Sequence, residues 1–136
     1  MLKAIIFDLP ETLVTEFDPD WKPPRLSTAD RLGISESDFQ RNAGPLRDVW
    51  SSGRIETYQD FVLALCSSAG HTPPASVMAE LTMEIATRKS ITFANIESSI
   101  LEMVEELRSR GLRLGVVTNA SDMDAEPWPG SVLAPL

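Results

Sequence analysis

Apolar residues run without interruption at two places in the chain and recur at helical spacing elsewhere. The first run is "AIIF", which stops at Asp8, and the second lies in "LRLGVVTNAS", which also stops at polar residues. A short continuous apolar run that ends at polar residues is typical of a strand buried on both faces in a parallel sheet. We therefore predict strands over residues 3–8 and 112–118.

Three helix starts follow one another between the two predicted strands. Each has a hydroxyl residue followed three positions later by a carboxylate, an arrangement close to a capping box. The three hydroxyl residues are Ser27, Ser35 and Thr57. The helix after Thr57 is expected to stop at Gly70. The helix after Ser35 is expected to break at Gly44 and Pro45, because proline has no N–H group to donate.

Two further helices complete the pattern. An apolar stripe predicts a helix from Ala75 to about Ser90, and Asn95 is expected to cap a helix that stops at Gly111, directly before the second apolar run. A helix followed by a short loop and a buried strand is half of a βαβ unit. The sequence therefore predicts an α/β fold, a parallel sheet with a helical insertion after its first strand.

Composition and charge limit the classes of partner and compartment. The chain has 136 residues, with 43% hydrophobic and 24% charged residues, which predicts a soluble globular protein of about one modest domain. The net charge of -8 and the lack of a basic patch argue against a nucleic-acid partner. No run is long enough for a membrane span or a signal peptide. The single cysteine, Cys66, has apolar neighbours and is expected to be a packed thiol, so we predict a cytoplasmic protein.

Polar residues at the ends of the two predicted strands are candidates for chemistry. Ligands of parallel α/β sheets bind outside the carboxyl ends of the strands, where this chain has Asp8 and, on the second strand, Thr118 and Asn119. A carboxylate at such a place can accept a phosphoryl group or bind magnesium, and a hydroxyl can donate to phosphoryl oxygens. Taken alone, Asp8 could equally end a strand and begin a turn.

The two motifs together resemble those of the haloacid dehalogenase-like hydrolases. "IIFDLPETLV" resembles the first motif of that family, an apolar strand followed by Asp-x-Asp-x-Thr, and "LRLGVVTNAS" resembles the second. The resemblance covers about residues 1–122. It implies a partial Rossmann-like parallel-sheet core over residues 1–16 and 93–136. Residues 17–92 lie where the family inserts an α-helical cap domain.

The resemblance also implies a role for each matching residue. Asp8 matches the nucleophile that forms an aspartyl-phosphate, and Thr12 matches the threonine of the same motif. Thr118, with Asn119 beside it, matches the group that binds the phosphoryl oxygens. Magnesium would be held by the Asp8 carboxylate, the backbone carbonyl of Pro10 and acids from a later motif. The implied substrate is a small phosphorylated metabolite.

This sequence departs from the family pattern in two ways. Pro10 stands where the family has its general acid/base, and proline has no ionisable group. Glu11, at a position that is often glycine, is expected to point elsewhere. The family's third motif, a lysine, and its fourth, an acidic pair, are expected beyond the second strand. The segment "SDMDAEPWPGSVLAPL" has no lysine, and its Asp122 and Asp124 are expected to be loop acids, so the chain resembles the front half of such a hydrolase.

Three interpretations therefore stay open. The first is a magnesium-dependent, phosphatase-type hydrolase that is catalytically impaired. The second is a non-catalytic scaffold that serves as a binding or assembly module. The third is a 2-haloacid dehalogenase, which needs neither magnesium nor an acid at position 10. Because only one partner strand is visible, an open sheet edge also predicts a homo-oligomer.

Overall fold

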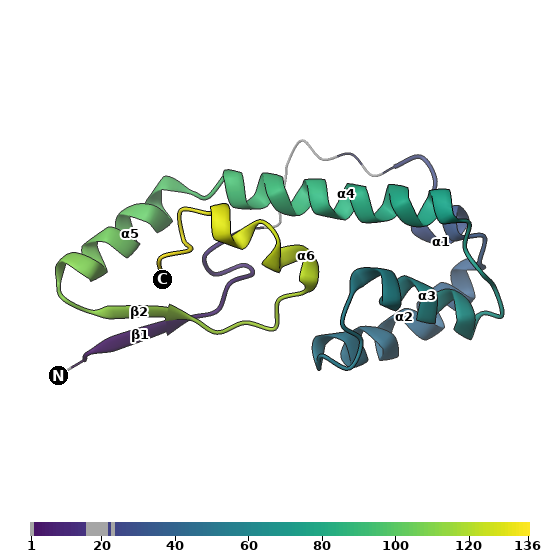
Figure 1. The fold of residues 1–136 in the computed structure, drawn as a ribbon, viewed down its shortest axis with the longest axis horizontal. Helices are drawn as coiled ribbons and strands as arrows, with labels where there is room; N and C mark the ends of the chain where they lie inside the picture. The colour runs from purple at the N-terminus through teal and green to yellow at the C-terminus, as the bar shows by residue number, and fades with distance from the viewer. Residues whose placement is uncertain (1, 16–21, 23) are drawn as a thin grey trace.

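The computed structural model describes residues 2–15, 22 and 24–136, and over these residues the fold is mixed α/β with helices predominating (Figure 1). The boundary predicted between residues 16 and 17 lies outside the described residues. None of the helices in the described part of the chain is both long and apolar enough to cross a membrane. In chain order the elements are β1 Ala4–Phe7, α1 Thr28–Leu32, α2 Glu36–Ser51, α3 Tyr58–Ser68, α4 Ala75–Ala94, α5 Ser98–Ser109, β2 Arg113–Val116, α6 Asp122–Ala125 and the 3₁₀ turn η1 Trp128–Gly130.

The two predicted strands form a parallel pair, in which Phe7 lies opposite Val116. Each strand is shorter than predicted, and burial on both faces is wrong. Phe7 and Val116 pack into an apolar cluster with residues of α5, whereas Ile6, on the other face, is 67% exposed. The reason is that, among the described elements, helical cover lies on one face of the sheet, where α5 runs alongside the strands (Figure 1).

The three predicted helix starts are confirmed. The side-chain oxygens of Ser27, Ser35 and Thr57 each accept a hydrogen bond from the backbone N–H three residues later, at 3.0 to 3.1 Å. Each bond satisfies one of the N–H groups that a helix leaves unpaired at its start. Local sequence alone therefore sets where α1, α2 and α3 begin.

The predicted break in α2 is wrong. The helix continues from Glu36 to Ser51 with Pro45 inside it. Proline removes one backbone hydrogen bond, but α2 also packs along α3 and buries Ala43 in the core. Packing of this kind can offset a locally unfavourable residue, because tertiary contacts supply most of a helix's stability.

The predicted cap at Asn95 is also wrong. Helix α4 extends to Ala94, and Asn95 ends it by donating from its side-chain amide to the carbonyl of Ile91 at 2.9 Å. Helix α5 instead begins after Glu97, whose side chain makes no capping hydrogen bond. Asparagine suits both ends of a helix, so its presence alone did not fix which end it would occupy.

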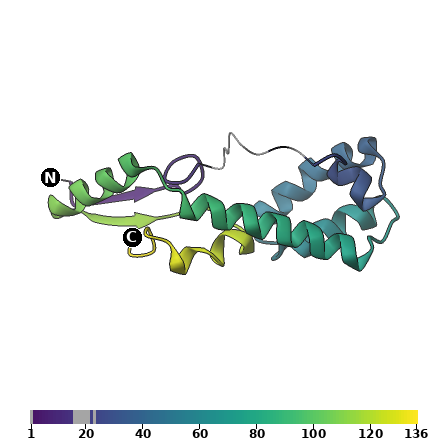
Figure 2. The ribbon, with the colours of Figure 1, turned by 90° about the horizontal axis from the view of Figure 1, so that it is seen from above.

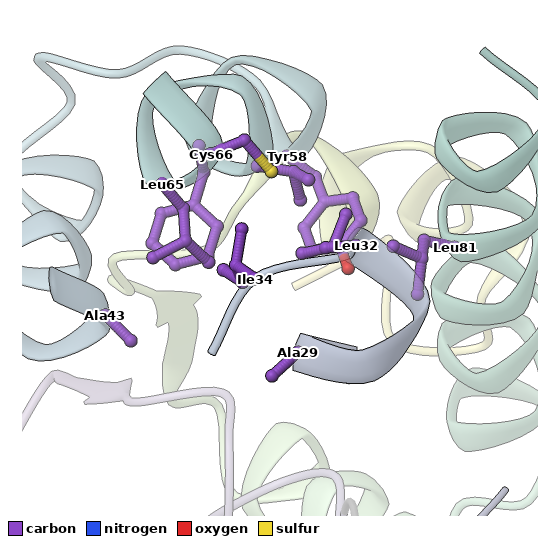
Figure 3. Close-up of a cluster of buried hydrophobic side chains, with 10 residues drawn as sticks. Ala29, Leu32, Ile34, Ala43, Tyr58, Leu65, Cys66 and Leu81 are labelled. Atoms are coloured by element: carbon purple, nitrogen blue, oxygen red, sulfur yellow. The ribbon is translucent and has the colours of Figure 1, made fainter. Parts of the chain in front are cut away.

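Buried side chains form two separate clusters. In the first, which we call the helical-block core, residues from α1, α2, α3 and α4 meet (Figure 3). Its Cys66 is fully buried, as predicted, and burial raises the pKa of the thiol. The second, the strand core, gathers residues from the turn after β1, α4, α5 and the C-terminal segment, namely Leu9, Leu13, Val14, Phe93, Val104 and Leu133.

Helix α4 connects the two clusters. It places Leu81 in the helical-block core and Phe93 in the strand core, so it runs along most of the molecule (Figures 1 and 2). The position proposed as the end of the cap, residue 92, therefore falls inside a continuous helix. Both strands point toward α2 and α3. Their carboxyl ends therefore face the helical block, by which we mean helices α1 to α4 (Figure 1).

Candidate functional site

The carboxyl ends of β1 and β2 lie beside each other. The N–H of Val117 donates to the carbonyl of Phe7 at 2.9 Å, so the pairing extends one residue past β2. Asp8 and Thr118 follow this last pair on their respective strands. The Asp8 carboxylate is exposed and accepts a hydrogen bond from the N–H of Leu9 at 2.8 Å.

A tight turn follows Asp8. The carbonyl of Leu9 accepts hydrogen bonds from the N–H groups of Leu13 at 3.0 Å and Val14 at 3.1 Å, and all three side chains are buried. Glu11 has a φ of 53°, in the left-handed region that favours glycine, and it is the position where the resembled motif often has glycine. Thr12 is exposed on this turn. The apolar residues of the turn therefore anchor it, and Thr12 is left at the surface.

A cavity of about 1140 Å³ lies between the strand ends and the helical block. Three of the predicted site residues line it, namely Pro10, Thr118 and Asn119. Asp8 and Thr12 do not line the cavity, although each is only a short distance along the chain from Pro10. The cavity is thus lined by the two residues expected to bind a phosphoryl group and by one expected magnesium ligand, but not by the expected nucleophile.

The hydroxyl of Thr118 is the least satisfied polar group at this site. Its oxygen is buried and has no hydrogen-bond partner among the described residues. Leaving a buried polar group unpaired costs about 1–3 kcal/mol. Because a hydroxyl can both donate and accept, a ligand oxygen that reached this atom would remove the cost.

A lysine that the sequence analysis did not consider also lines the cavity. Lys89, on α4, pairs with Asp124 at 2.6 Å, and the two side chains are only 18% and 11% exposed. The prediction that Asp122 and Asp124 are loop acids is wrong, because both lie in α6 and Asp124 is buried. Ser121 caps this short helix, with its hydroxyl 2.7 Å from the Asp124 carboxylate. The signal was present in the sequence, since "SDMD" repeats the spacing that located the other three caps.

The groups around Asp124 change the pKa of its carboxyl. Burial alone would raise the pKa of this carboxyl, but hydrogen bonds from Lys89 and Ser121 and the positive charge of Lys89 lower it further than burial raises it. The net pKa therefore lies below the ordinary value, and Asp124 stays ionised at neutral pH.

The other acid of α6 reaches the helical block. The Asp122 carboxylate accepts a hydrogen bond from the N–H of Tyr58 at 3.0 Å. Tyr58 is the first residue of α3, so Asp122 satisfies a second open N–H at the start of that helix and places a negative charge where the helix dipole favours one. Helix α6 therefore contacts both α4 and α3 and forms one wall of the cavity.

A magnesium site is not complete in the described residues. Asp8 offers one carboxylate, and Pro10 offers a backbone carbonyl close to it in sequence. Among the residues that the structure describes, no three His, Cys, Asp or Glu side chains group where they could hold a metal ion. Magnesium usually needs several oxygen ligands arranged octahedrally, and these residues supply only the first part of such a set.

Comparison with protein-family models, with curated proteins and with solved structures finds no match to this chain. The functional argument therefore depends on the geometry of the site and on the motifs in the sequence.

Proposed function

We propose that the chain is a haloacid dehalogenase-like hydrolase of phosphatase type, with a partial Rossmann-like core and an inserted helical cap, and that its catalysis is impaired. The parallel pairing of β1 and β2 supports this, with an acid after the first strand and a hydroxyl after the second. The helical block of α1 to α4 follows β1, where such a cap would be inserted. The proposed ligand is a small phosphorylated metabolite.

The observation that carries the proposal is the buried, unpartnered hydroxyl of Thr118 at the carboxyl end of β2. It lines a large cavity beside Asn119, whose amide can also donate to an oxygen. A phosphoryl group has several acceptor oxygens and would satisfy the donors of both side chains. These two donors support a phosphoryl group at the strand ends, the place where ligands of parallel α/β folds bind.

Turnover would begin with attack of an Asp8 carboxylate oxygen on phosphorus. The bond from phosphorus to the ester oxygen breaks, an aspartyl-phosphate forms, and water later hydrolyses it to phosphate. Pro10 can neither protonate the departing alcohol nor activate that water. General acid/base catalysis is worth about 10²–10⁴ in rate, so both steps would be slow.

A second candidate function is a non-catalytic scaffold that binds a ligand or assists assembly. The exposed position of Asp8, outside the lining of the cavity, favours this candidate, because a nucleophile must reach the bound phosphorus. A 2-haloacid dehalogenase is a lesser alternative. It would be recognised by metal-independent release of halide from a 2-haloacid.

The test combines binding with activity. Inorganic phosphate should bind the full 136-residue chain in a calorimetric titration, and Thr118→Val should weaken this binding about tenfold, the usual effect of losing a hydrogen bond to a charged group. Thr72→Val, at an exposed loop residue away from the cavity, should leave binding unchanged. Absence of phosphate binding, or equal binding by the two variants, would contradict the proposed site.

Activity separates the two candidate functions. With an aryl phosphate and magnesium, we expect the unmodified chain to show negligible turnover, and Pro10→Asp alone to remain nearly inactive. Robust magnesium-dependent turnover that Asp8→Asn abolishes would show that another group supplies the missing acid and base. Slow residual turnover that Asp8→Asn abolishes would favour the impaired hydrolase, whereas phosphate binding with no turnover that depends on Asp8 would favour the scaffold.

A further inference from the structure

The two sides of the cavity differ in chemical character. On the strand side the lining includes the polar residues Thr118, Asn119 and Ser121, together with Pro10 and Ala120. From the helical block it is lined mainly by apolar and aromatic side chains. These are Leu32, Phe39, Trp50, Ile55, Tyr58, Phe61, Val62, Leu65 and Ile85. A ligand that spans the cavity therefore meets a polar surface at one end and an apolar surface at the other.

The apolar side has both a rigid wall and accessible side chains. Trp50 stacks on Phe61 with ring centroids 5.1 Å apart, and Tyr58 packs against both rings. Tyr58 and Phe61 are each 8% exposed and form the back of this wall. Trp50 and Ile55 are half-buried, so parts of these side chains remain available to a ligand. Aromatic rings add stacking energy beyond simple area burial when another ring packs on them.

The polar residues on the helical-block side are mostly engaged or exposed. The hydroxyl of Ser52 donates to the carbonyl of Val49 at 2.7 Å and accepts from Arg54 at 3.1 Å. Arg47 and Glu56 are exposed and lie toward solvent. These groups therefore form a rim, and they do not supply the dense set of free donors and acceptors that a sugar's hydroxyl groups would need.

The charges that line the cavity sum to zero. Arg47 and Lys89 contribute two positive charges, and Glu56 and Asp124 contribute two negative charges, with Lys89 already paired to Asp124. The chain as a whole is acidic, with a net charge of -8. A ligand with several phosphate groups would find no excess of positive charge here, so the cavity favours a ligand with one phosphoryl group over one with several.

We infer that the cavity takes phosphate monoesters whose organic group is apolar, with the phosphoryl group at Thr118 and the apolar group, such as an aromatic ring, against Trp50 and Ile55. This inference rests on the proposed function, because it assumes that the strand ends hold the phosphoryl group. It adds that the helical block selects against sugar phosphates and nucleoside polyphosphates.

Three small probes test the two ends of the cavity separately by calorimetric titration into the full chain. Methylphosphonate presents the phosphoryl end alone, benzyl alcohol the ring alone, and phenylphosphonate both. We expect phenylphosphonate to bind at least about tenfold more tightly than methylphosphonate, because burying a ring removes a large apolar area from water. Thr118→Val should weaken both phosphonates by a similar factor.

Variants of cavity-lining residues test where the ring of phenylphosphonate binds. Ile55→Asn, in the loop between α2 and α3, should remove most of the preference for phenylphosphonate and leave methylphosphonate binding unchanged. Leu63→Asn is the matched control, since Leu63 is 46% exposed on α3 and does not line the cavity. Trp50→Leu is a second variant at the same wall. Circular dichroism is used to check that each variant is folded.

The outcomes distinguish the two proposals. The inference would be overturned if the two phosphonates bound equally, or if Ile55→Asn and Trp50→Leu both kept the preference for phenylphosphonate. Neither result would contradict the proposed phosphoryl site. Benzyl alcohol binding as tightly as phenylphosphonate, with no binding of methylphosphonate, would overturn the proposed function. Failure of all three probes to bind would overturn both.

Discussion

Among the residues that the structure describes, Lys89 and Asp124 form the most buried ion pair. Each would be costly to bury alone, because a charge loses its hydration in the protein interior. Their 2.6 Å contact and the hydrogen bonds from Ser121 to Asp124 compensate for that loss. The pair joins α4 to α6 and thereby holds one wall of the cavity in place.

Removing the cation should destabilise the protein measurably. Lys89→Met leaves Asp124 buried without its positive partner, and we expect a loss of about 1–3 kcal/mol in the free energy of unfolding in urea. The matched control is Arg110→Met, which breaks an exposed pair with Glu106 in which the side chains are 67% and 59% exposed. The control should cost about 0.5 kcal/mol or less. Equal losses in the two variants would show that the buried pair adds nothing.

The stabilisation by Asp124 should depend on pH in one direction. Its folded pKa lies below the ordinary value, so its contribution is complete above the unfolded pKa of about 4 and is lost as the pH falls through the folded pKa. The measurement is the difference in unfolding free energy between the unmodified chain and Asp124→Asn. This difference should be largest at neutral pH and shrink progressively below about pH 4. A difference that grows with acidity would contradict the assignment.

At the scale of elements, α2 contains a residue that its own backbone disfavours. Pro45 is exposed in the middle of the helix and cannot donate to the preceding turn. We expect Pro45→Ala to stabilise the protein by about 1–3 kcal/mol, because an interior proline costs about 3 kcal/mol relative to alanine and packing has compensated for part of this. Thermal unfolding followed by circular dichroism would measure the change.

The neighbouring glycine provides the comparison for Pro45. A Cβ added at Gly44 meets nothing within 4 Å, so Gly44→Ala tests helix propensity alone. It should stabilise by about 0.5–1 kcal/mol, less than Pro45→Ala. If Pro45→Ala gave no gain while Gly44→Ala did, proline would instead be favoured at this site by contacts or by its effect on the unfolded chain.

The helix starts were predictable because a cap is a local interaction. Ser27, Ser35 and Thr57 bond to N–H groups three residues away, and the sequence contains both partners. The course of α2 through Pro45 and the end of α4 at Asn95 were not predictable in this way. The first depends on packing of α2 against α3, which outweighs the preference of a single residue. The second was open because asparagine suits either end of a helix.

The candidate site was predictable only in part, for a similar reason. Thr118 and Asn119 were found because they follow a continuous apolar run that predicts a strand, a pattern visible in the sequence. Lys89 was not found, because it lies on the helix that connects the two cores and reaches the cavity only after the chain has folded. Asp8 ends its strand as predicted, but spacing along the chain does not determine whether a side chain enters a cavity.

At the scale of the whole molecule, one face of the sheet is left uncovered by the described residues. Ile6 and Val117 lie on the same face by strand alternation, and each is 67% exposed. Over the described residues β1 and β2 pair only with each other, so each also has an unpaired outer edge. Exposed apolar surface beside an open strand edge is a favourable site for association with another chain.

We therefore expect the chain to self-associate through this face. Burying an Ile or Val side chain is worth about 1.5–3 kcal/mol, and a symmetric dimer would bury both residues from each copy. The double variant Ile6→Gln with Val117→Gln should weaken association at least about tenfold in sedimentation equilibrium. The matched control, Met83→Gln with Leu63→Gln, replaces residues that are 67% and 46% exposed on helices and should leave association unchanged. A strictly monomeric mass for the unmodified chain at high concentration would contradict this prediction, and equal weakening by both double variants would show that association does not use the sheet.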